Sequence, residues 1–402
     1  MTKRNALWMA LLLLALGGLA ALARLSGEAP PTPAGDDGQT RTDAGAEASP
    51  QAVVDPSRES LQSLRNNPPR RIDAHTHVAP GDLDAFMKIM EAAGIDGIVN
   101  FSGGFPGGGL EQQLEAAARY PHRVAVMMNL DWRSFGRPGW VEAQVAALEQ
   151  GKALGAAGLK ISKALGLGVR HPDGKLLAVD DPLLDPIFEA CGRLGLPVAI
   201  HTGDPRAFFD APTPENERYL ELQKNPGWSF HGKDFPEWRA LREAFLARIG
   251  RHPKTTFIGV HFGNSPEDPR WVADVMDQFP NLYIDTAARL PEVLRQEDPV
   301  RWRETRRVFD RHTERVLFGS DSMQMGGELI LGAPGARKMH RTDAAVFFRT
   351  HWRLFQTSDF DVPSPSPIQG KWPLRSLGLK RNHLEPFYHG TAERLFPQLA
   401  TP

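Results

Sequence analysis

Residues 72–78 read IDAHTHV, and this stretch says more about the protein than any other part of the sequence. Its apolar residues are typical of a buried β-strand. Side chains at positions i, i+2 and i+4 of a strand share one face, so we expect Asp73, His75 and His77 to point the same way. Unpaired polar groups on a buried face cost free energy. The stretch therefore predicts half of a transition-metal site, against the plainer interpretation of two surface or hydrogen-bonded histidines.

The region around this stretch, from Pro69 to the C-terminus, alternates short apolar runs with helical periodicity. Eight runs are expected to be strands, at residues 72–78, 97–101, 124–130, 158–162, 198–201, 256–261, 282–285 and 316–319. Helices are expected at residues 82–93, 110–119, 139–154, 183–194, 237–251, 267–279, 299–312 and 342–356. Eight such units predict an α/β protein with a closed (β/α)8 TIM barrel. The Pro-rich stretches 204–234 and 358–380 are expected to be rim insertions, after strand 5 and near the C-terminus.

The N-terminal region is expected to lie outside the barrel. Lys3 and Arg4 precede an uncharged run rich in leucine and alanine, and Ala21-Leu22-Ala23 offers a cleavage site. The run is also near the lower length limit for spanning a bilayer. Residues 1–24 are therefore predicted to be a signal peptide or an uncleaved signal anchor, of a protein exported to the periplasm or another extracytoplasmic space. Residues 25–67 predict a disordered linker, because they hold almost no large apolar side chains, and residues 68–400 the catalytic domain.

The composition is that of an ordinary globular protein. Hydrophobic residues make up 41% and charged residues 24% of the 402, and the formal net charge is −1. Without a basic excess, no nucleic-acid partner is expected. Membrane contact is expected only through an uncleaved N-terminal segment, and a homo-oligomer remains open. The one cysteine, Cys191, cannot form an intramolecular disulfide, and its helical surroundings predict a buried apolar role.

Polar residues mark the ends of several predicted strands. His75 and His77 end the first, His201 the fifth and His261 the sixth, while Asp321 follows the eighth. Lys160 lies in the fourth strand. The carboxyl ends of barrel strands meet at one mouth, which holds the active site. These side chains are therefore expected to lie close together.

This ordered set resembles the amidohydrolase superfamily, and within it the amidohydrolase-related branch, over roughly residues 71–397. The closing segment 388–396, YHGTAERLF, adds to the resemblance, although the family usually has an asparagine where His389-Gly390-Thr391 stands here. The resemblance implies one divalent metal ion, zinc or alternatively manganese. The implied ligands are His75, His77, His201 and Asp321.

The resemblance also implies catalytic roles. Asp321 would accept the proton of a metal-activated water, and His261 would be the acid–base group that polarises a carbonyl or steadies the water. In two-metal members a carboxylated lysine on strand 4 bridges the ions, so a second metal here would require carboxylation of Lys160. In one-metal members that lysine binds substrate or supports the ligands. We expect one metal.

Other residues have weaker signals. Arg289, after the seventh strand, is expected either to bind a substrate carboxylate or to be a solvated residue at a helix start. Asp204 is expected to bind substrate or to orient His201, and Asp285 to accept a hydrogen bond at the barrel mouth. The glycine-rich loop 103–109 lacks the Gly-Lys-Ser/Thr of a phosphate-binding loop, so a rim loop is expected.

Three functions remain open at this point. The first is a metal-dependent hydrolase that cleaves an amide, ester or lactone bond in a small molecule. The second is a metal-dependent, non-oxidative decarboxylase of the same branch, which an arginine in the pocket would favour. The third is an exported binding protein without catalysis, against which the complete set of ligand residues argues.

Overall fold

The computed structural model describes residues 67–332 and 339–401. The predicted signal segment and nearly all of the predicted linker lie outside the described residues. Within the described ranges, no helix is both long and apolar enough to cross a membrane.

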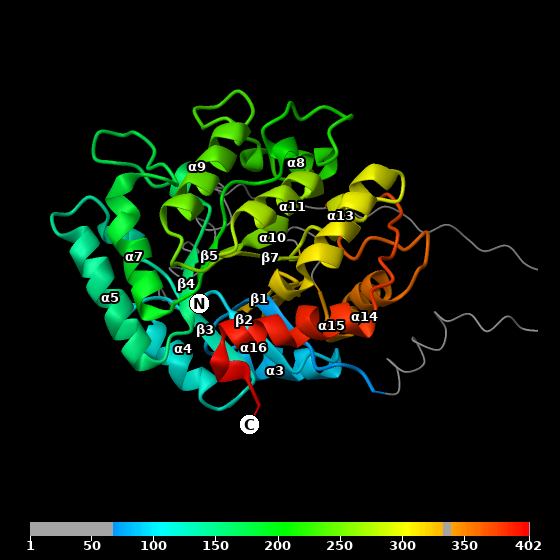
Figure 1. The fold of residues 1–402 in the computed structure, drawn as a ribbon, viewed down its shortest axis with the longest axis horizontal. Coiled ribbons are helices and arrows are strands. Elements are labelled where there is room, and N and C mark those ends of the chain that lie inside the picture. The colour runs from blue at the N-terminus through cyan, green and yellow to red at the C-terminus, as the bar shows by residue number, and fades with distance from the viewer. Residues whose placement is uncertain (1–66, 333–338, 402) are drawn as a thin grey trace, which may run out of the picture.

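The predicted (β/α)8 barrel is confirmed. Eight parallel strands follow one another around the sheet in sequence order (Figure 1). They are β1 (Ile72–Val78), β2 (Gly97–Asn100), β3 (Val124–Met128), β4 (Gly158–Ile161), β5 (Val198–Ile200), β6 (Phe257–Gly259), β7 (Leu282–Asp285) and β8 (Val316–Leu317). The strands are buried over almost their whole length, as expected of a parallel sheet covered on both faces.

The barrel closes through the chain that follows β8. Ala74 N donates to Phe318 O over 2.8 Å, and Asp321 N donates to His75 O over 3.0 Å. Beyond these bonds the chain enters β9 (Ser322–Met325), which pairs with β1 in parallel. Asp321 is therefore held beside His75 by main-chain hydrogen bonds.

A hairpin after β8 was missing from the predicted elements. β9 pairs antiparallel with β10 (Glu328–Ile330). The two-residue turn is Gly326-Gly327, and both residues have positive φ angles, of 60° and 79°. Glycine adopts such angles without the steric cost that other residues incur, so a Gly-Gly pair between apolar runs is a hairpin signal. This signal is present in the sequence, and the hairpin that it predicts forms one wall of the barrel mouth.

Helices surround the sheet, close to where they were expected. The main ones are α3 (Leu83–Ala92), α4 (Leu110–Ala117), α5 (Trp140–Leu154), α7 (Asp185–Leu194), α9 (Trp238–Arg251), α11 (Pro269–Gln278), α13 (Pro299–His312) and α14 (Arg341–Gln356). Shorter ones are α6 (Ala164–Leu167), α8 (Tyr219–Lys224), α10 (Val260–Gly263), α12 (Leu290–Val293), α15 (Arg381–Glu385) and α16 (Thr391–Leu395). The main helices bury apolar faces against the sheet, which forms the larger core cluster.

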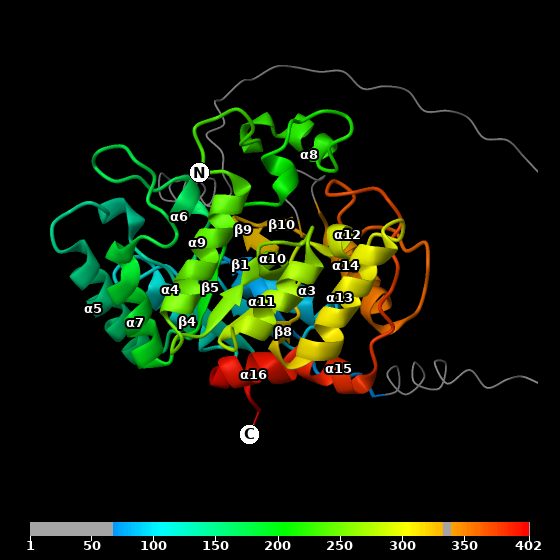
Figure 2. The same cartoon turned by 45° about the horizontal axis from the view of Figure 1, so that its top comes forward.

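The two ends of the barrel are covered differently. A second apolar cluster comes from alternate strand positions, including Val99, Phe101 and Met127, and from Phe396 and Leu399 near the C-terminus. Helix α16 therefore plugs the amino-terminal end of the barrel. The insertion after β5, which carries α8, covers the opposite end (Figure 2). The carboxyl ends of the strands thus lie beneath a rim, as predicted.

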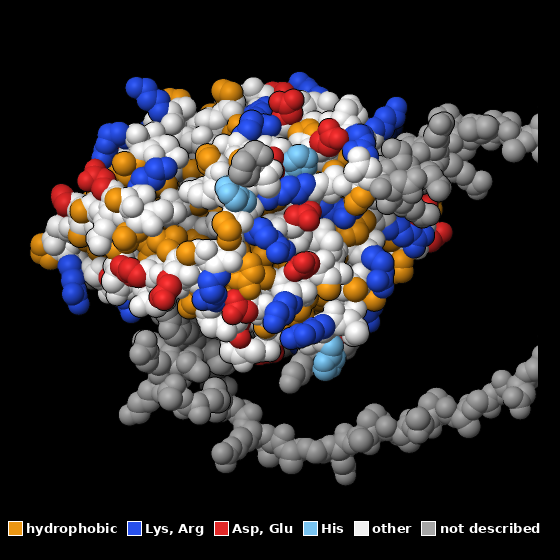
Figure 3. Space-filling model, turned by 90° about the horizontal axis from the view of Figure 1, so that it is seen from below, with side chains coloured by type: hydrophobic (Ala, Val, Ile, Leu, Met, Phe, Trp, Pro, Cys, Tyr) orange, Lys and Arg blue, Asp and Glu red, His pale blue; other side chains and the backbone are white. Residues whose placement is uncertain are grey.

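Charge on the surface is mixed. On the face in Figure 3, lysine and arginine side chains alternate with aspartate and glutamate. That face therefore has no extended patch of one charge sign, in keeping with the near-zero net charge of the sequence.

Candidate metal centre

A cavity of about 470 Å³ lies at the carboxyl ends of the strands. Its volume is within the range of small-molecule sites. The site residues predicted from the sequence all line it: His75, His77, Lys160, His201, Asp204, His261, Arg289 and Asp321. Aromatic side chains and the glycine-rich loop 103–109 form other parts of its wall.

Strand β1 supplies two of these residues, and one prediction about it is wrong. His75 and His77 line the cavity, but Asp73 does not. Asp73 accepts hydrogen bonds from the backbone N–H groups of His75 (3.2 Å) and Ser320 (3.0 Å). The pairing register of β1 against β2 shifts between Asp73 and Thr76. This irregularity breaks the two-residue alternation on which the prediction of a shared face rested.

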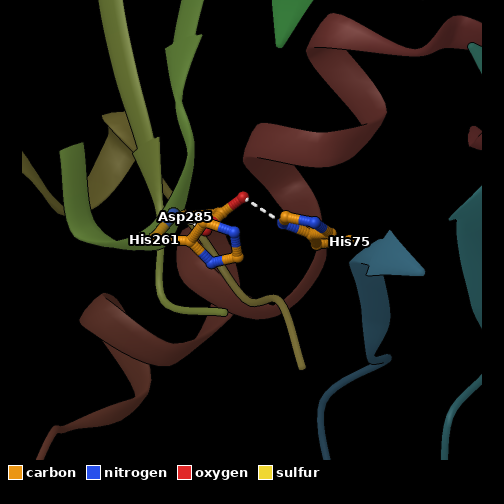
Figure 4. A group of neighbouring side chains, drawn as sticks. All are labelled: His75, His261 and Asp285. Atoms are coloured by element: carbon orange, nitrogen blue, oxygen red, sulfur yellow. Dashed lines mark hydrogen bonds and ion pairs between the residues drawn. The ribbon is translucent and has the colours of Figure 1, made fainter. Parts of the chain in front are cut away.

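Asp285, at the end of β7, orients two of the histidines. Its Oδ2 lies 2.8 Å from His75 Nδ1, and its Oδ1 accepts the His261 backbone N–H over 2.7 Å. Figure 4 shows the carboxylate beside both residues. Because a carboxylate accepts, His75 Nδ1 carries the proton and Nε2 keeps its lone pair. In many metal sites, the histidine nitrogen that does not bind the metal donates a hydrogen bond to a carboxylate in the same way.

Asp321 faces the free nitrogens of the β1 histidines. Its Oδ1 lies 3.4 Å from His75 Nε2 and 3.6 Å from His77 Nε2. His77 Nδ1 is engaged by Ser102 Oγ at 2.8 Å, which leaves Nε2 to face Asp321. Ligands about 2.1 Å from a tetrahedral zinc ion lie roughly 3.4 Å apart. The spacing and chemistry of these three donors therefore fit one ion between them, and their ligand atoms all lie within 4.8 Å of one another.

His201 lines the same cavity but stands apart from this trio. Among the described residues, it does not join the set whose ligand atoms lie within 4.8 Å of one another. Its backbone is fixed by a hydrogen bond to Ile161 O (3.0 Å). Its Nε2 lies 3.8 Å from Asp204 Oδ1, and its ring centroid lies 4.4 Å from that of His261. The structure thus brings together three of the four ligands implied by the resemblance.

His261 has a defined tautomer. Its Nδ1 lies 3.0 Å from Ala287 O, and a carbonyl oxygen can only accept, so Nδ1 carries the proton and Nε2 is free. Burial lowers the pKa of His261 well below its ordinary value, and the nearby Arg289 guanidinium lowers it further. His261 is therefore a neutral imidazole that presents one unprotonated nitrogen.

Burial dominates the protonation states of the other ionisable groups here. It lowers the pKa values of His77 and His201 well below the ordinary value, and neighbouring positive charges lower them further. Burial raises the pKa of Asp321, although His75 and Arg289 oppose the rise. Neutral imidazoles are the form that binds metal ions, and a carboxylate with a raised pKa is a better proton acceptor.

The backbone around the site is strained. Five residues other than glycine have positive φ angles near the carboxyl ends of β6, β7 and β8: His261 (55°), Phe262 (59°), Asn264 (59°), Ala288 (54°) and Asp321 (60°). Such conformations cost free energy and persist only where the surrounding structure imposes them. Asn264 is an example of a residue held in this conformation by its surroundings. Its side chain accepts from Thr202 N (2.8 Å) and donates to Ile200 O (3.2 Å) at the end of β5.

Lys160 extends from β4 into the cavity wall. Its Nζ donates to Ile161 O over 3.0 Å and lies 5.5 Å from the centroid of the Phe101 ring. Burial lowers its pKa to about 8, although Asp285 and Asp321 oppose the shift. A lysine with this pKa has a substantial neutral fraction in mild alkali, which is the form that carboxylation requires.

Lys163 is a cavity residue that the sequence analysis missed. Its Nζ donates to Asp204 Oδ2 over 2.6 Å, so Asp204 is paired with a buried cation rather than free. Glu221 from α8 and Met323 from β9 also line the cavity. Lys163 lies three positions after Lys160, just beyond a strand end. That position was the only feature of the sequence that indicated a place in the cavity.

Removing the negative charge of Asp285 is expected to weaken metal binding. Asp285→Asn should lower the affinity for zinc by about 10–100-fold, because His75 loses a charged acceptor that fixes its tautomer. Titration of metal-free protein against a chromogenic chelator measures this. Asp131→Asn, which changes a cavity carboxylate that contacts Arg133 instead, is the control and should keep the affinity. Equal affinities would contradict the assigned role of Asp285.

Lys160→Met is expected to stabilise the metal-free protein in a pH-dependent way. Below pH 8 lysine is charged in both folded and unfolded protein, so the wild type bears the full cost of a buried ammonium group. Between the folded pKa of about 8 and the unfolded value of 10.5, the folded protein loses its proton first and wild-type stability rises. The variant should therefore gain about 3 kcal/mol below pH 8 and lose this advantage toward pH 10.5.

Urea denaturation at pH 7, 9 and 10.5 tests this, with the exposed Lys152→Met as the matched control. A stability difference that does not change with pH would contradict the pKa assigned to Lys160.

Comparison with known proteins supports the resemblance. The family profile described as "Amidohydrolase" matches residues 31–398. A search of curated proteins gave no matching relative. Similar solved structures include an uncharacterised TIM-barrel protein from Bordetella bronchiseptica, with 16% identity over 82% of this chain and 99% of that chain and a TM-score of 0.48. The 2,6-dihydroxybenzoate decarboxylase from Rhizobium has 14% identity, the same coverage and a TM-score of 0.48. Amidohydrolase 2 from Bifidobacterium longum subsp. infantis has 15% identity over 82% and 98% of the two chains, with a TM-score of 0.43.

Proposed function

Because this chain belongs to the amidohydrolase family, we propose that it is a metal-dependent hydrolase that cleaves an amide, ester or lactone bond in a small molecule. One observation carries the proposal. His75, His77 and Asp321 converge on a common point inside a cavity of small-molecule size. In a cluster that only stabilises the fold, each imidazole nitrogen would be expected to have its own hydrogen-bond partner. Here two imidazole nitrogens face the same carboxylate oxygen instead.

The proposed cofactor is one divalent ion, zinc in the first instance and manganese as the alternative. His75, His77 and Asp321 would hold it, and His201 on the same cavity wall is the proposed fourth ligand. Nitrogen and carboxylate ligands suit zinc. When bound, such an ion lowers the pKa of a water molecule and polarises a carbonyl. A second ion is proposed only if Lys160 becomes carboxylated.

Two residues are proposed to accept a proton or to orient the reacting groups. The partly buried carboxylate of Asp321 is the proposed acceptor of the proton that leaves the attacking water, since its raised pKa favours holding that proton. His261 presents an unprotonated Nε2 to the cavity region, where it would orient the water or a protonated leaving group. Asp285 and Ser102 would keep His75 and His77 in the required tautomers.

A decarboxylase is the second candidate. Arg289 favours it, because this buried arginine lines the same cavity and is suited to hold a carboxylate. In that reaction the carbon–carbon bond to the carboxylate breaks, carbon dioxide leaves, and the carbon that held it takes up a proton.

Metal analysis with product analysis tests both candidates. We expect about one equivalent of zinc or manganese per chain, and hydrolysis of members of a panel of small amides, esters and lactones in ¹⁸O-labelled water with label in the product. Carbon dioxide released from aromatic carboxylates, without label uptake by the product, would support the decarboxylase instead. Folded protein without bound metal would overturn both and favour the binding protein.

We also propose that the protein acts outside the cytoplasm, on the basis of residues 1–24, which lie outside the described residues. Fractionation of cells that express the full-length chain tests this. Recovery in the cytoplasmic fraction would contradict it. A mature N-terminus near Arg24 would distinguish cleavage from anchoring.

A further inference from the structure

A second cavity lies beside the insertion after β5. It has a volume of about 990 Å³, and none of the residues that line it also lines the metal cavity. Its walls come from the insertion, from α9, from the start of α11 and the chain before it, and from the chain around the start of α13. These helices follow one another around the barrel beside the insertion (Figure 1). We call this second cavity the outer groove.

Glu267, in the wall of the outer groove, has a carboxylate without a partner. Both its oxygens are buried, and no other residue in the described ranges donates a hydrogen bond to either of them. An unpaired buried charge is costly. Burial accordingly raises the pKa of Glu267 to about 7, although its own backbone N–H opposes the rise. The carboxylate therefore offers two acceptor oxygens to a donor that enters the groove.

The charged neighbours of Glu267 do not supply that donor. Glu217, from the insertion, raises the pKa of Glu267 further, whereas Arg242 of α9 and Arg301 of α13 lower it. Both arginines are paired elsewhere: Arg242 Nη1 lies 3.4 Å from Asp268 Oδ2, and Arg301 Nη1 lies 3.6 Å from Glu217 Oε2. These ion pairs are long for hydrogen bonds. Movement of the two arginine side chains can therefore open a path to the Glu267 oxygens.

The outer groove suits an organic cation better than a metal ion. Among the described residues, Glu267 belongs to no group of three histidine, cysteine, aspartate or glutamate residues whose ligand atoms lie within 4.8 Å of one another. Two tryptophans of the wall offer aromatic faces instead. The Arg242 guanidinium lies 4.6 Å from the ring centroid of Trp238 and 3.7 Å from that of Trp271. The indole rings of this groove therefore already attract a planar cation.

We propose that the outer groove is a binding site for a guanidinium-bearing ligand, with the Glu267 carboxylate as its anchor. A guanidinium and a carboxylate match through two parallel hydrogen bonds, which uses both free oxygens of Glu267. A guanidinium also stacks on aromatic rings, as Arg242 does here. The volume of the groove leaves room for the chain that carries the cation, which is either an arginine side chain of a peptide or a free alkylguanidine.

Calorimetry on metal-loaded, full-length protein at pH 8 tests the site. The probes are butylguanidinium with its neutral isostere butylurea, and a capped tripeptide with a central arginine or, as its neutral isostere, citrulline. We expect the wild type to bind a guanidinium probe at least about tenfold more tightly than its isostere, and Glu267→Gln to lose this preference. Glu243→Gln, which changes an exposed carboxylate of the same groove, is the matched control and should behave as wild type. The guanidinium probe that binds more tightly identifies the source, peptide or free alkylguanidine.

The preference should also depend on pH. The ionised carboxylate is the form that binds a cation, so affinity is lost as the pH falls through the Glu267 pKa of about 7. Butylguanidinium should therefore bind the wild type about tenfold more weakly at pH 6 than at pH 8. Glu267→Gln removes an unpaired buried charge, so this variant should stay folded, which circular dichroism checks.

Four results would overturn the proposal: no guanidinium preference in the wild type, a preference that survives in Glu267→Gln, an equal loss in Glu243→Gln, or an affinity that does not change with pH. Sedimentation velocity tests a different occupant. A wild-type dimer that dissociates in Glu267→Gln would assign the groove to an arginine of a second copy of the chain and would overturn the assignment to a separate ligand.

Discussion

His75→Ala is expected to abolish stoichiometric metal binding and to lower activity by at least roughly 10³-fold, because the acceleration from a metal-activated water is lost. The residue contributes a ligand nitrogen directed at Asp321 and is itself held by Asp285. His77→Ala removes the second ligand nitrogen on the same strand and should have a similar effect. Metal per chain, measured by atomic emission spectroscopy on purified protein, is the primary readout.

The control for this experiment is His231→Ala, which removes an exposed histidine from the insertion after β5. It should leave the metal content unchanged. Circular dichroism of each variant separates loss of metal from loss of fold. Full metal content in folded His75→Ala protein would refute the proposed centre. The same measurement on His201→Ala tests its assignment as the fourth ligand, with loss of metal expected.

The largest stability effect is expected from Arg218. This arginine is 1% exposed and joins Glu221 of α8 to Glu292 of α12, so it fastens the insertion to the loop after β7. Replacing it with methionine leaves two buried carboxylates without a cation. Removing one partner of a buried ion pair costs about 3–5 kcal/mol, far more than the pair itself contributes relative to apolar residues. Urea denaturation of Arg218→Met should show a loss of this size.

Two further variants sharpen this prediction. Arg206→Met removes an exposed arginine of the same insertion, 3.4 Å from Asp210, and should cost less than about 1 kcal/mol. Arg218→Met combined with Glu221→Gln and Glu292→Gln should recover at least half of the loss, since none of the three positions then carries a buried charge. A single variant Arg218→Met as stable as Arg206→Met would contradict the role of the network.

The barrel was predictable because its signals are local. Each strand is a short apolar run, each main helix has its own 3.6-residue periodicity, and the order of the units restricts the topology. Strand lengths were less predictable. The eighth strand was expected to reach Gly319 but ends at Leu317, because the chain then turns to hydrogen-bond with β1. The β9–β10 hairpin was not predicted, although the Gly326-Gly327 pair is a sequence signal for it.

The barrel, the identity of the cavity-lining histidines and the order in which strand ends supply them could all be inferred from the sequence, since they follow from periodicity and spacing along one chain. Which side chains meet in the cavity depends on the three-dimensional fold. The fold excludes Asp73 through a register shift, pairs Asp204 with Lys163, sets Asp285 behind His75 and leaves Arg289 Nε without a hydrogen-bond acceptor among the described residues. These outcomes depend on distances of a few ångströms between residues far apart in sequence, and on backbone strain imposed by surrounding packing, neither of which a local pattern encodes.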